Sequence, residues 1–259
     1  MRRYPAERLV CLTEETVETL YLLGEEDRIV GVSGYAVRPP RVRKEKPRIS
    51  SFTSADVARI AALKPDLVLA FSDIQGPIIP ELARAALPVY LFNQRDLAGI
   101  FAMIRTLGAL IGCSEKADTL ARDLEDRVTK IAAETRARTA RPRVYFEEWD
   151  SPMISGIGWV SELIEIAGGI DIFADLSKNP EAKERIVASE QVIEHRPDVI
   201  LASWCGKKVR LDSFGARAGW SDLPAIKAGR IVEIKSPLIL QPGPAALTDG
   251  LDAIRIALD

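Results

Sequence analysis

Residues 64–72 read Lys-Pro-Asp-Leu-Val-Leu-Ala-Phe-Ser, and residues 196–204 read Arg-Pro-Asp-Val-Ile-Leu-Ala-Ser-Trp. In both stretches a basic-Pro-Asp turn precedes a short apolar run, which is typical of a buried strand in a parallel sheet. Two copies far apart in the chain predict two similar α/β lobes. Each copy places an aromatic residue, Phe71 or Trp204, near the carboxyl end of its strand, where open α/β sheets bind ligands.

The segments around these two copies alternate between predicted strands and helices. In the first half we predict strands at 8–12, 29–32, 67–71 and 88–92, and helices at 13–23, 55–63, 78–86 and 98–111. The polar, Pro-rich residues 37–51 predict a loop. In the second half we predict strands at 144–147, 199–202 and 231–234, and helices at 159–167, 189–195 and 245–257. Alternating strands and helices are typical of parallel sheets.

Residues 114 to about 138 form the longest predicted helix, because they contain no Gly or Pro and repeat apolar residues every third or fourth position. About 25 helical residues span roughly 37 Å, enough for a stiff connection between lobes. An ordinary surface helix has the same pattern, so both interpretations stay open. We expect an amino-terminal α/β lobe at 1–113, a linking helix at 114–139 and a carboxyl-terminal α/β lobe at 140–259, each lobe Rossmann-like with a central parallel sheet.

The composition is ordinary for a soluble globular protein, with 47% hydrophobic and 28% charged residues. A net charge of −2 argues against nucleic acid or an anionic membrane as the main partner. No run approaches the ~18 apolar residues of a membrane span. No apolar signal core precedes the first strand, so we expect a cytoplasmic protein as the sequence is written, or a periplasmic one if a leader was removed.

Residues that could support catalysis are scarce. His195 is the only histidine, and its place at a predicted helix end favours a structural role. The three cysteines have no metal-site spacing; we expect Cys11 and Cys113 in the core, while the role of Cys205 stays open. There is no phosphate-binding glycine motif. We therefore predict that the protein is not an enzyme and has no catalytic cofactor and no direct metal site.

Polar and aromatic side chains gather instead where the predicted strands end, which is the make-up of a small-molecule pocket. The candidate ligand-binding residues are Glu15, Tyr35, Phe71, Ser72, Asn93, Trp149, Met153, Trp204, Lys207 and Leu238. Glu147 ends the strand predicted at 144–147, and Glu148 and Asp150 follow it. All three are interpreted as hydrogen-bond acceptors. The basic residues 38–48 are expected to form a solvated loop, with contact to an anion as the alternative.

Several stretches resemble a known family. Residues 9–20 read Leu-Val-Cys-Leu-Thr-Glu-Glu-Thr-Val-Glu-Thr-Leu, and residues 58–70 read Ala-Arg-Ile-Ala-Ala-Leu-Lys-Pro-Asp-Leu-Val-Leu-Ala. Together with Gly-Gly-Ile-Asp-Ile-Phe at 168–173 and Ala-Ser-Glu-Gln-Val-Ile at 188–193, they resemble the vitamin B12-binding proteins of ABC importers. Their wider class binds cobalamin, ferric siderophores or haem.

The resemblance implies a class III periplasmic-binding-protein fold and a non-enzymatic receptor that holds its ligand between two lobes with little hinge motion. It also implies that Tyr35, Phe71, Trp149, Trp204 and residues 237–240 line a corrinoid pocket. The expected ligand is cobalamin or a related corrinoid, and the resemblance implies a role in ABC-type uptake. A ferric siderophore or haem is the alternative, as is a cytoplasmic corrinoid carrier without a transporter.

The chain departs from the family in three places. The positions of the glutamates that dock on the permease hold Pro77 and about Leu240, with Glu81 and Asp249 nearby but offset. Residues 235–244 lack the usual aromatic residue, and no leader is evident. An ABC permease therefore stays an open partner, whereas a small-molecule ligand is expected, and we expect a monomer.

Overall fold

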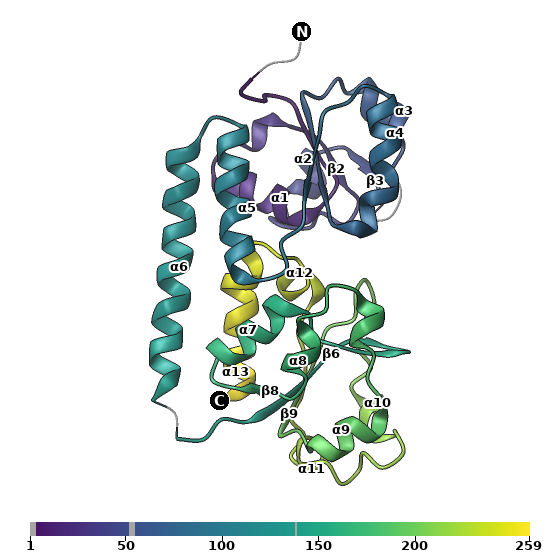
Figure 1. Ribbon diagram of the computed structural model, residues 1–259, viewed down its shortest axis with the longest axis vertical. Coiled ribbons are helices and arrows are strands. Elements are labelled where there is room, and N and C mark those ends of the chain that lie inside the picture. The colour runs from purple at the N-terminus through teal and green to yellow at the C-terminus, as the bar shows by residue number, and fades with distance from the viewer. Residues whose placement is uncertain (1–3, 52–54, 138) are drawn as a thin grey trace. The chain divides into compact units, whose positions relative to one another are not determined.

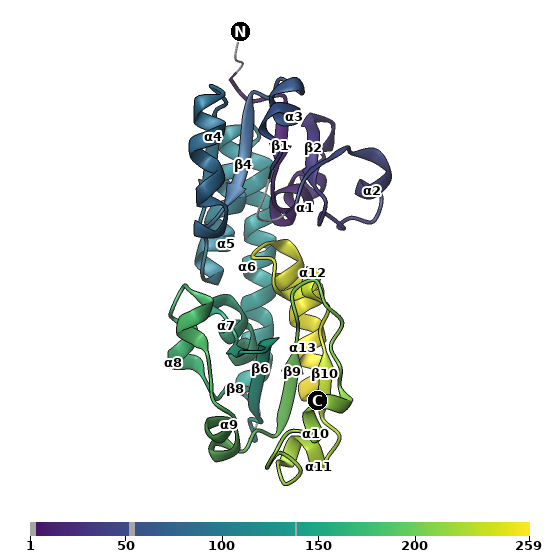
Figure 2. The same ribbon diagram turned by 90° about the vertical axis from the view of Figure 1, so that its right-hand side faces the viewer.

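The computed structural model describes residues 4–51, 55–137 and 139–259 (Figures 1 and 2). The chain divides into two compact units, an amino-terminal unit, Met1–Glu125, and a carboxyl-terminal unit, Asp126–Asp259. Two predictions fall partly outside the described residues. The expectation about a leader depends in part on residues 1–3, and the long helix was expected to end near residue 138.

The amino-terminal unit is built on a parallel sheet with strand order β3-β2-β1-β4-β5. Its strands are β1 (Leu9–Cys11), β2 (Ile29–Ser33), β3 (Arg48–Ser50), β4 (Leu67–Phe71) and β5 (Val89–Phe92). All four pairings are parallel. The central strands β1 and β4 are apolar and buried along their whole length, which confirms the strand predicted after the first Pro-Asp turn.

The helices that cover this sheet are α1 (Glu14–Leu22), α2 (Val42–Glu45), α3 (Val57–Ala62), α4 (Ile79–Arg84) and α5 (Leu97–Leu110). Short 3₁₀ turns occur at Glu26–Arg28 and Asp73–Ile78. The prediction of a loop at 37–51 was wrong, because this segment contains α2 and β3. The polar residues of this segment mask the pattern of β3. Its buried Ile49 belongs to the same apolar cluster as Val10 and Val68, and its backbone pairs with β2.

The long predicted helix is present as α6 (Ser114–Arg136), the teal helix of Figure 1. Its repeating apolar residues Ala117, Leu124, Val128 and Ile131 are buried, as their spacing predicts. The boundary between the two units falls inside α6, between Glu125 and Asp126. The proposed division at 113 and 140 remains a prediction.

The carboxyl-terminal unit has a second sheet with strand order β10-β9-β6-β7. The strands are β6 (Arg143–Asp150), β7 (Met153–Ser155), β9 (Val199–Ala202) and β10 (Ile231–Glu233), and β8 (Ile170–Asp171) pairs with β6. Pairings of β6 with β8 and β9, and of β9 with β10, are parallel, but β7 is antiparallel to β6. The predominantly parallel α/β class is confirmed, while β7 and β8 were not predicted.

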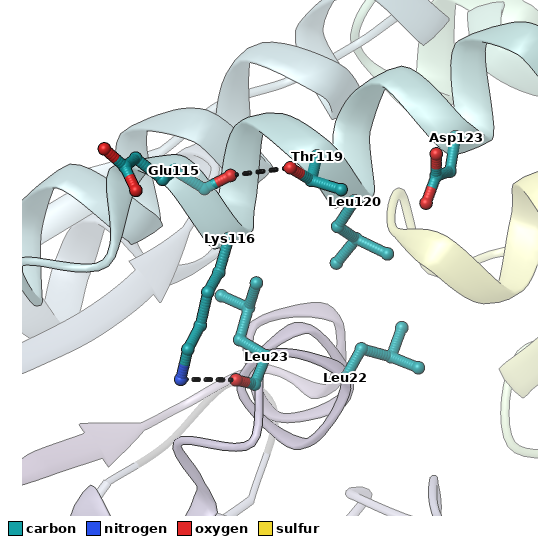
Figure 3. A pocket seen from close by; sticks show the side chains of 7 residues that line it. All are labelled: Leu22, Leu23, Glu115, Lys116, Thr119, Leu120 and Asp123. Atoms are coloured by element: carbon teal, nitrogen blue, oxygen red, sulfur yellow. Dashed lines mark hydrogen bonds between the residues drawn. The ribbon is translucent and has the colours of Figure 1, made fainter.

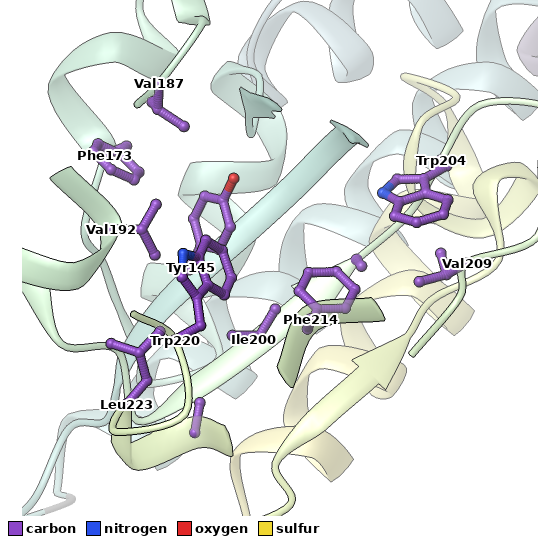
Figure 4. Close-up of a cluster of buried hydrophobic side chains, with 12 residues drawn as sticks. Tyr145, Phe173, Val187, Val192, Ile200, Trp204, Val209, Phe214, Trp220 and Leu223 are labelled. Atoms are coloured by element: carbon purple, nitrogen blue, oxygen red, sulfur yellow. The ribbon is translucent and has the colours of Figure 1, made fainter. Parts of the chain in front are cut away.

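The helices of this unit are α7 (Gly158–Ile166), α8 (Ala174–Ser177), α9 (Ser189–His195), α10 (Asp212–Gly215), α11 (Pro224–Lys227), α12 (Ser236–Ile239) and α13 (Leu251–Leu258), with a 3₁₀ turn at Ala182–Arg185. A π-helical turn, Ala246–Gly250, leads into α13. The buried cluster in Figure 4 brings Tyr145 of β6 together with Phe214 and Trp220, which come from later segments of the chain. The second Pro-Asp copy therefore also supplies a buried strand, β9.

His195 is the last residue of α9 and lies edge-on to Phe173, with ring centroids 5.3 Å apart. This position agrees with the structural role predicted for it. Cys11 is buried, as expected, but Cys113 is only half-buried and Cys205 is exposed. Within the described ranges no helix is long and apolar enough to cross a membrane.

Candidate functional site

The carboxyl edge of the first sheet carries the candidate residues of the amino-terminal unit. Because its strands are parallel, the residues after β1, β2, β4 and β5 all emerge at this edge. Glu15 and Ser72 are buried there, Tyr35 is 49% exposed, and Asn93 is exposed. The sequence-predicted residues Glu15, Tyr35, Phe71, Ser72 and Asn93 thus share one edge.

Arg95 links the ends of β4 and β5. Its guanidinium carbon lies 5.5 Å from the ring centroid of Phe71, its Nη2 donates to Asp73 at 2.6 Å, and its Nε donates to Asn93 Oδ1 at 3.1 Å. Phe71 itself is 6% exposed, so its ring lies largely beneath the surface. The backbone of Ser72 has a φ of 60°, which turns the chain sharply out of β4.

Two buried carboxyl groups begin α1 at the same edge. Thr13 Oγ1 donates to Glu15 Oε1 at 2.6 Å and does not cap the helix by accepting from a backbone N–H. The Oε2 atoms of Glu14 and Glu15 have no hydrogen-bond partner among the described residues. Burial raises the pKa of Glu14 to about 7. Burial also raises the pKa of Glu15, to about 8, because its effect is larger than that of the Thr13 hydrogen bond, which lowers this pKa. Near neutral pH these groups are substantially neutral acids.

The Glu15→Gln variant tests this pair. The raised pKa means that the folded chain binds more protons than the unfolded chain between about pH 4.5 and 8, so wild-type stability falls as pH rises through that range. Glutamine keeps the uncharged form, so the variant should be several kcal/mol more stable than wild type at pH 9, at about 1.4 kcal/mol for each unit by which the pKa of Glu15 is raised, and nearly equal at pH 4. Glu14 remains and keeps part of the slope.

Urea denaturation across pH 4–9 measures this difference. The control is Glu115→Gln on the exposed surface of α6, whose pH profile should run parallel to that of wild type. A constant difference between Glu15→Gln and wild type at all pH values would contradict the assignment of a buried, neutral Glu15.

Three carboxylates lie near the carboxyl end of β6, and each pairs with a cation of its own unit. The most deeply buried is Glu147, which is 0% exposed. Arg217 donates to both of its oxygens, at 2.6 and 2.9 Å. The hydroxyl of Tyr145 and the indole N–H of Trp204 complete its shell, each at 3.1 Å. The sequence predicts an acceptor at Glu147 but not its partner Arg217, which lies 70 residues further along the chain.

Glu148 and Asp150 form the other two pairs. The buried Arg185 donates to Glu148 at 2.6 and 3.2 Å, and also to the backbone oxygen of Ser155. Lys207 donates to both oxygens of Asp150, at 2.6 and 2.8 Å. All three carboxylates are acceptors, as interpreted from the sequence, but their donors are cations of this chain.

The Lys207 side chain lies between two indole rings. Its Nζ is 4.6 Å from the ring centroid of Trp149 and 4.7 Å from that of Trp204. Trp204 is 2% exposed and stacks on Phe214 at 6.2 Å (Figure 4). Phe214 and Lys207 therefore lie against the ring of Trp204, and its part in a ligand pocket remains a prediction. Trp149 is half-buried.

Met153 and Leu238 complete the sequence-predicted set. Met153 is half-buried in β7, with its Sδ 3.3 Å from Arg217 Nη1. Leu238 is half-buried in α12, a segment held by the Trp159 indole, which donates to the oxygen of Ile239 at 2.8 Å. The structure brings Trp149, Trp204 and Lys207 into direct contact, and does not bring Leu238 into that group.

A hollow of about 260 Å³ opens at the carboxyl ends of β9 and β10 in the carboxyl-terminal unit. It is lined by Trp204, Gly206, Lys207, Lys208, Glu233, Ile234, Lys235, Ser236 and Pro237. Three of these residues are lysines, so this hollow is basic.

A larger hollow of about 460 Å³ lies between the end of α1 and the first half of α6 (Figure 3). Leu22, Leu23 and Leu120 form its apolar part, and Lys116 donates to the oxygen of Leu23 at 3.4 Å. Because α1 runs back from the carboxyl edge of the sheet, this hollow lies toward the amino edge. Although this hollow is the larger of the two, we do not assign it as the ligand site, because none of the strand-end residues lines it.

Among the described residues no group of three or more His, Cys, Asp and Glu side chains could hold a metal ion. The carboxylates of β6 are held in ion pairs, and His195 lies at the end of α9. An α/β protein with aromatic and polar side chains at its strand ends has the make-up of a protein that binds a small molecule.

The chain belongs to the periplasmic binding protein family, which matches residues 9–238. A vitamin B12-binding protein of Vibrio parahaemolyticus is 28% identical over 251 residues, 95% of this chain and 88% of that protein. This confirms the resemblance stated for residues 9–20 and 58–70, and the family is non-enzymatic, as predicted.

Solved structures show the same fold. A periplasmic haem-binding protein from Roseiflexus sp. RS-1, in apo form, has a TM-score of 0.83 and 26% identity, covering 98% of this chain and 100% of that one. The periplasmic vitamin B12-binding protein of Vibrio cholerae has a TM-score of 0.79 and 25% identity, covering 98% and 97%. The α/β fold with two sheets is thus that of periplasmic binding proteins.

Proposed function

We propose that this chain is the substrate-binding protein of an ABC-type uptake system and that it binds cobalamin or a related corrinoid. The observation that carries the proposal is the match over 95% of the chain to a vitamin B12-binding protein. The exposed ring of Tyr35 and the half-buried indole of Trp149, both at strand ends, are the kind of surface on which a large planar ligand packs.

The proposed ligand-binding set is the one predicted from the sequence, with different tasks for its members. Tyr35 and Trp149 offer accessible aromatic surface. Trp204 supports Lys207 from beneath, because its ring is already covered. Ser72, Asn93, Met153 and Leu238 remain proposed contacts around them.

Binding of cyanocobalamin tests the proposal. Purified protein incubated with a twofold excess should elute from gel filtration with stoichiometric cyanocobalamin, visible by its absorption spectrum. Tyr35→Ala should weaken binding by about tenfold or more, because an aromatic side chain buried by a ligand contributes about 1.5–3 kcal/mol. Tyr4→Ala removes a ring that is 83% exposed in the same unit and should leave the affinity unchanged.

The second candidate ligand is haem, favoured by the 26% identity to the Roseiflexus haem-binding protein over nearly the whole of both chains. Hemin is titrated in parallel, followed by its Soret band. Tight binding of hemin, with no cyanocobalamin retained at micromolar concentration, would decide for haem and against the corrinoid.

The place of action and the permease belong to the same proposal. The family is periplasmic, so we propose that the protein works outside the cytoplasmic membrane and delivers its ligand to an ABC permease. Pro77 and Leu240 stand at the positions expected for docking glutamates, so any docking uses other side chains, such as Glu81. Fractionation of cells that express the tagged natural gene would show the protein in the periplasm; a purely cytoplasmic protein would contradict this part.

A further inference from the structure

The basic hollow at the ends of β9 and β10 contains more positive charge than its own carboxylates neutralise. Lys207, Lys208 and Lys235 line it together with one carboxylate, Glu233. At about 260 Å³ it is too small for a complete tetrapyrrole, since pockets that enclose drug-sized ligands measure roughly 300–1,000 Å³. Its size fits a single charged arm of a larger molecule.

Lys207 provides a fixed charge at the rim. Its ammonium is held by Asp150 and lies between the rings of Trp149 and Trp204. An ammonium has three N–H donors, and Asp150 accepts two of them, so one donor remains. Because the side chain is already ordered, it loses little conformational entropy when it binds an anion.

Lys235 and Lys208 provide the remaining donors. Lys235 gives one hydrogen bond to Glu233 at 2.6 Å and retains two. Burial opposes the ionisation of Glu233, but the hydrogen bonds from Lys235 and the Val209 N–H, with the charge of Lys208, outweigh it and lower its pKa. Glu233 is therefore a neutralised anion. No carboxylate of the described residues lies within ion-pair distance of Lys208, which interacts with Glu233 only through its charge and keeps all three N–H donors for a ligand.

We propose that this hollow is a subsite for an anionic oxygen group, a carboxylate or a phosphate, on the ligand of the protein, with Lys208 and Lys235 as its principal donors and Lys207 at its rim. The inference rests on the proposed function and adds a requirement to it: the bound tetrapyrrole carries an anionic arm. Cobalamin carries one phosphodiester and haem carries two carboxylates, so the two ligands present the same chemistry from different sources.

Paired ligands with and without the anion distinguish these sources. Cyanocobalamin is compared with dicyanocobinamide, which lacks the phosphodiester, and hemin is compared with its dimethyl ester. The charge-removing variant is Lys208→Gln combined with Lys235→Gln. The matched control is Lys227→Gln, an exposed lysine of the same unit paired with Asp222. Affinities are measured by absorption titration at 50 and 300 mM salt.

In the wild type we expect the anionic member of one pair to bind at least tenfold more tightly than its neutral partner, with the preference smaller at high salt. The double variant should lose this preference while binding the neutral member as wild type does, and Lys227→Gln should retain it. The pair that shows the preference identifies the source of the anion. An undiminished preference in the double variant would overturn the subsite and leave the proposed function intact.

A titration with inorganic phosphate tests the hollow without any tetrapyrrole. The indole N–H resonances of Trp149 and Trp204 report on it, because both rings contact Lys207. Saturable shifts in the wild type that disappear in the double variant would support the subsite, whether or not a tetrapyrrole binds. If no tetrapyrrole binds, that result counts against the proposed function and not against the subsite. The absence of saturable shifts, together with equal affinities within both ligand pairs, would overturn the subsite.

Discussion

Replacing Arg217 by methionine is expected to lower the free energy of unfolding by about 3–5 kcal/mol, because it leaves the carboxylate of Glu147 buried without its cation. Glu147 is 0% exposed, and Arg217 supplies two of its hydrogen bonds. The guanidinium also lies 4.4 Å from the ring centroid of Phe214 and 4.5 Å from that of Trp220. Methionine fills part of this space but cannot compensate the charge.

Urea denaturation at pH 7 measures the loss. A charge-matched double variant, Arg217→Met with Glu147→Gln, should recover much of the stability, since it removes the unpaired charge together with its partner. Lys178→Ala serves as the surface control, because its ion pair with Asp175 is exposed on both sides and should contribute nothing measurable. A single variant as stable as Lys178→Ala would show that Glu147 is not held by Arg217.

Replacing Gly250 by alanine is the second large expected effect. A Cβ atom at this position would lie 2.4 Å from the backbone oxygen of Leu238, and 3.2 Å from that of Ala245. The obstacle is backbone, which cannot rotate away as a flexible side chain can. Overpacking of this kind costs about 1–3 kcal/mol. We expect a loss near 3 kcal/mol, because α12, which is also held by Trp159, must shift away from the π-helical turn.

Thermal unfolding measures this loss, with Gly76→Ala as the matched control. A Cβ atom on Gly76 would meet nothing within 4 Å, so this variant should be neutral or slightly stabilising. Because α12 carries Leu238 and follows Lys235, the Gly250 variant should also weaken ligand binding. Unchanged stability in Gly250→Ala would show that α12 can move at little cost.

The strands and helices that the sequence predicts are mostly those with a strong local pattern of apolar and turn residues. The two Pro-Asp copies became β4 and β9, and the apolar repeat at 114–138 became α6, because these patterns depend only on neighbours along the chain. The strands that were missed depend on distant pairing. β3 is three residues long and is held by β2, while β7 and β8 are held by β6.

The candidate site divides in a similar way. The order of strands and helices places Glu15, Phe71, Trp149 and Trp204 near strand ends, and that much follows from the sequence. The sequence could not show that Trp204 is covered by Phe214, or that Arg217 neutralises Glu147. In the sequence, Arg217 is one arginine in a short polar segment, and nothing near it in the chain indicates that Glu147 is its partner.

The sequence by itself determined the α/β class, the central buried strands and the long helix, because apolar periodicity and turn residues act over a few positions. The binding-protein family was indicated separately, by the resemblance of stretches such as 9–20 and 58–70. Only the tertiary structure decided which charges are compensated and which remain available. Glu147, Glu148 and Asp150 are neutralised by cations 37–70 residues away, whereas Lys208 keeps its charge at the edge of a hollow. Electrostatic compensation depends on distance in space, and residues far apart in the chain become neighbours only when the sheets form.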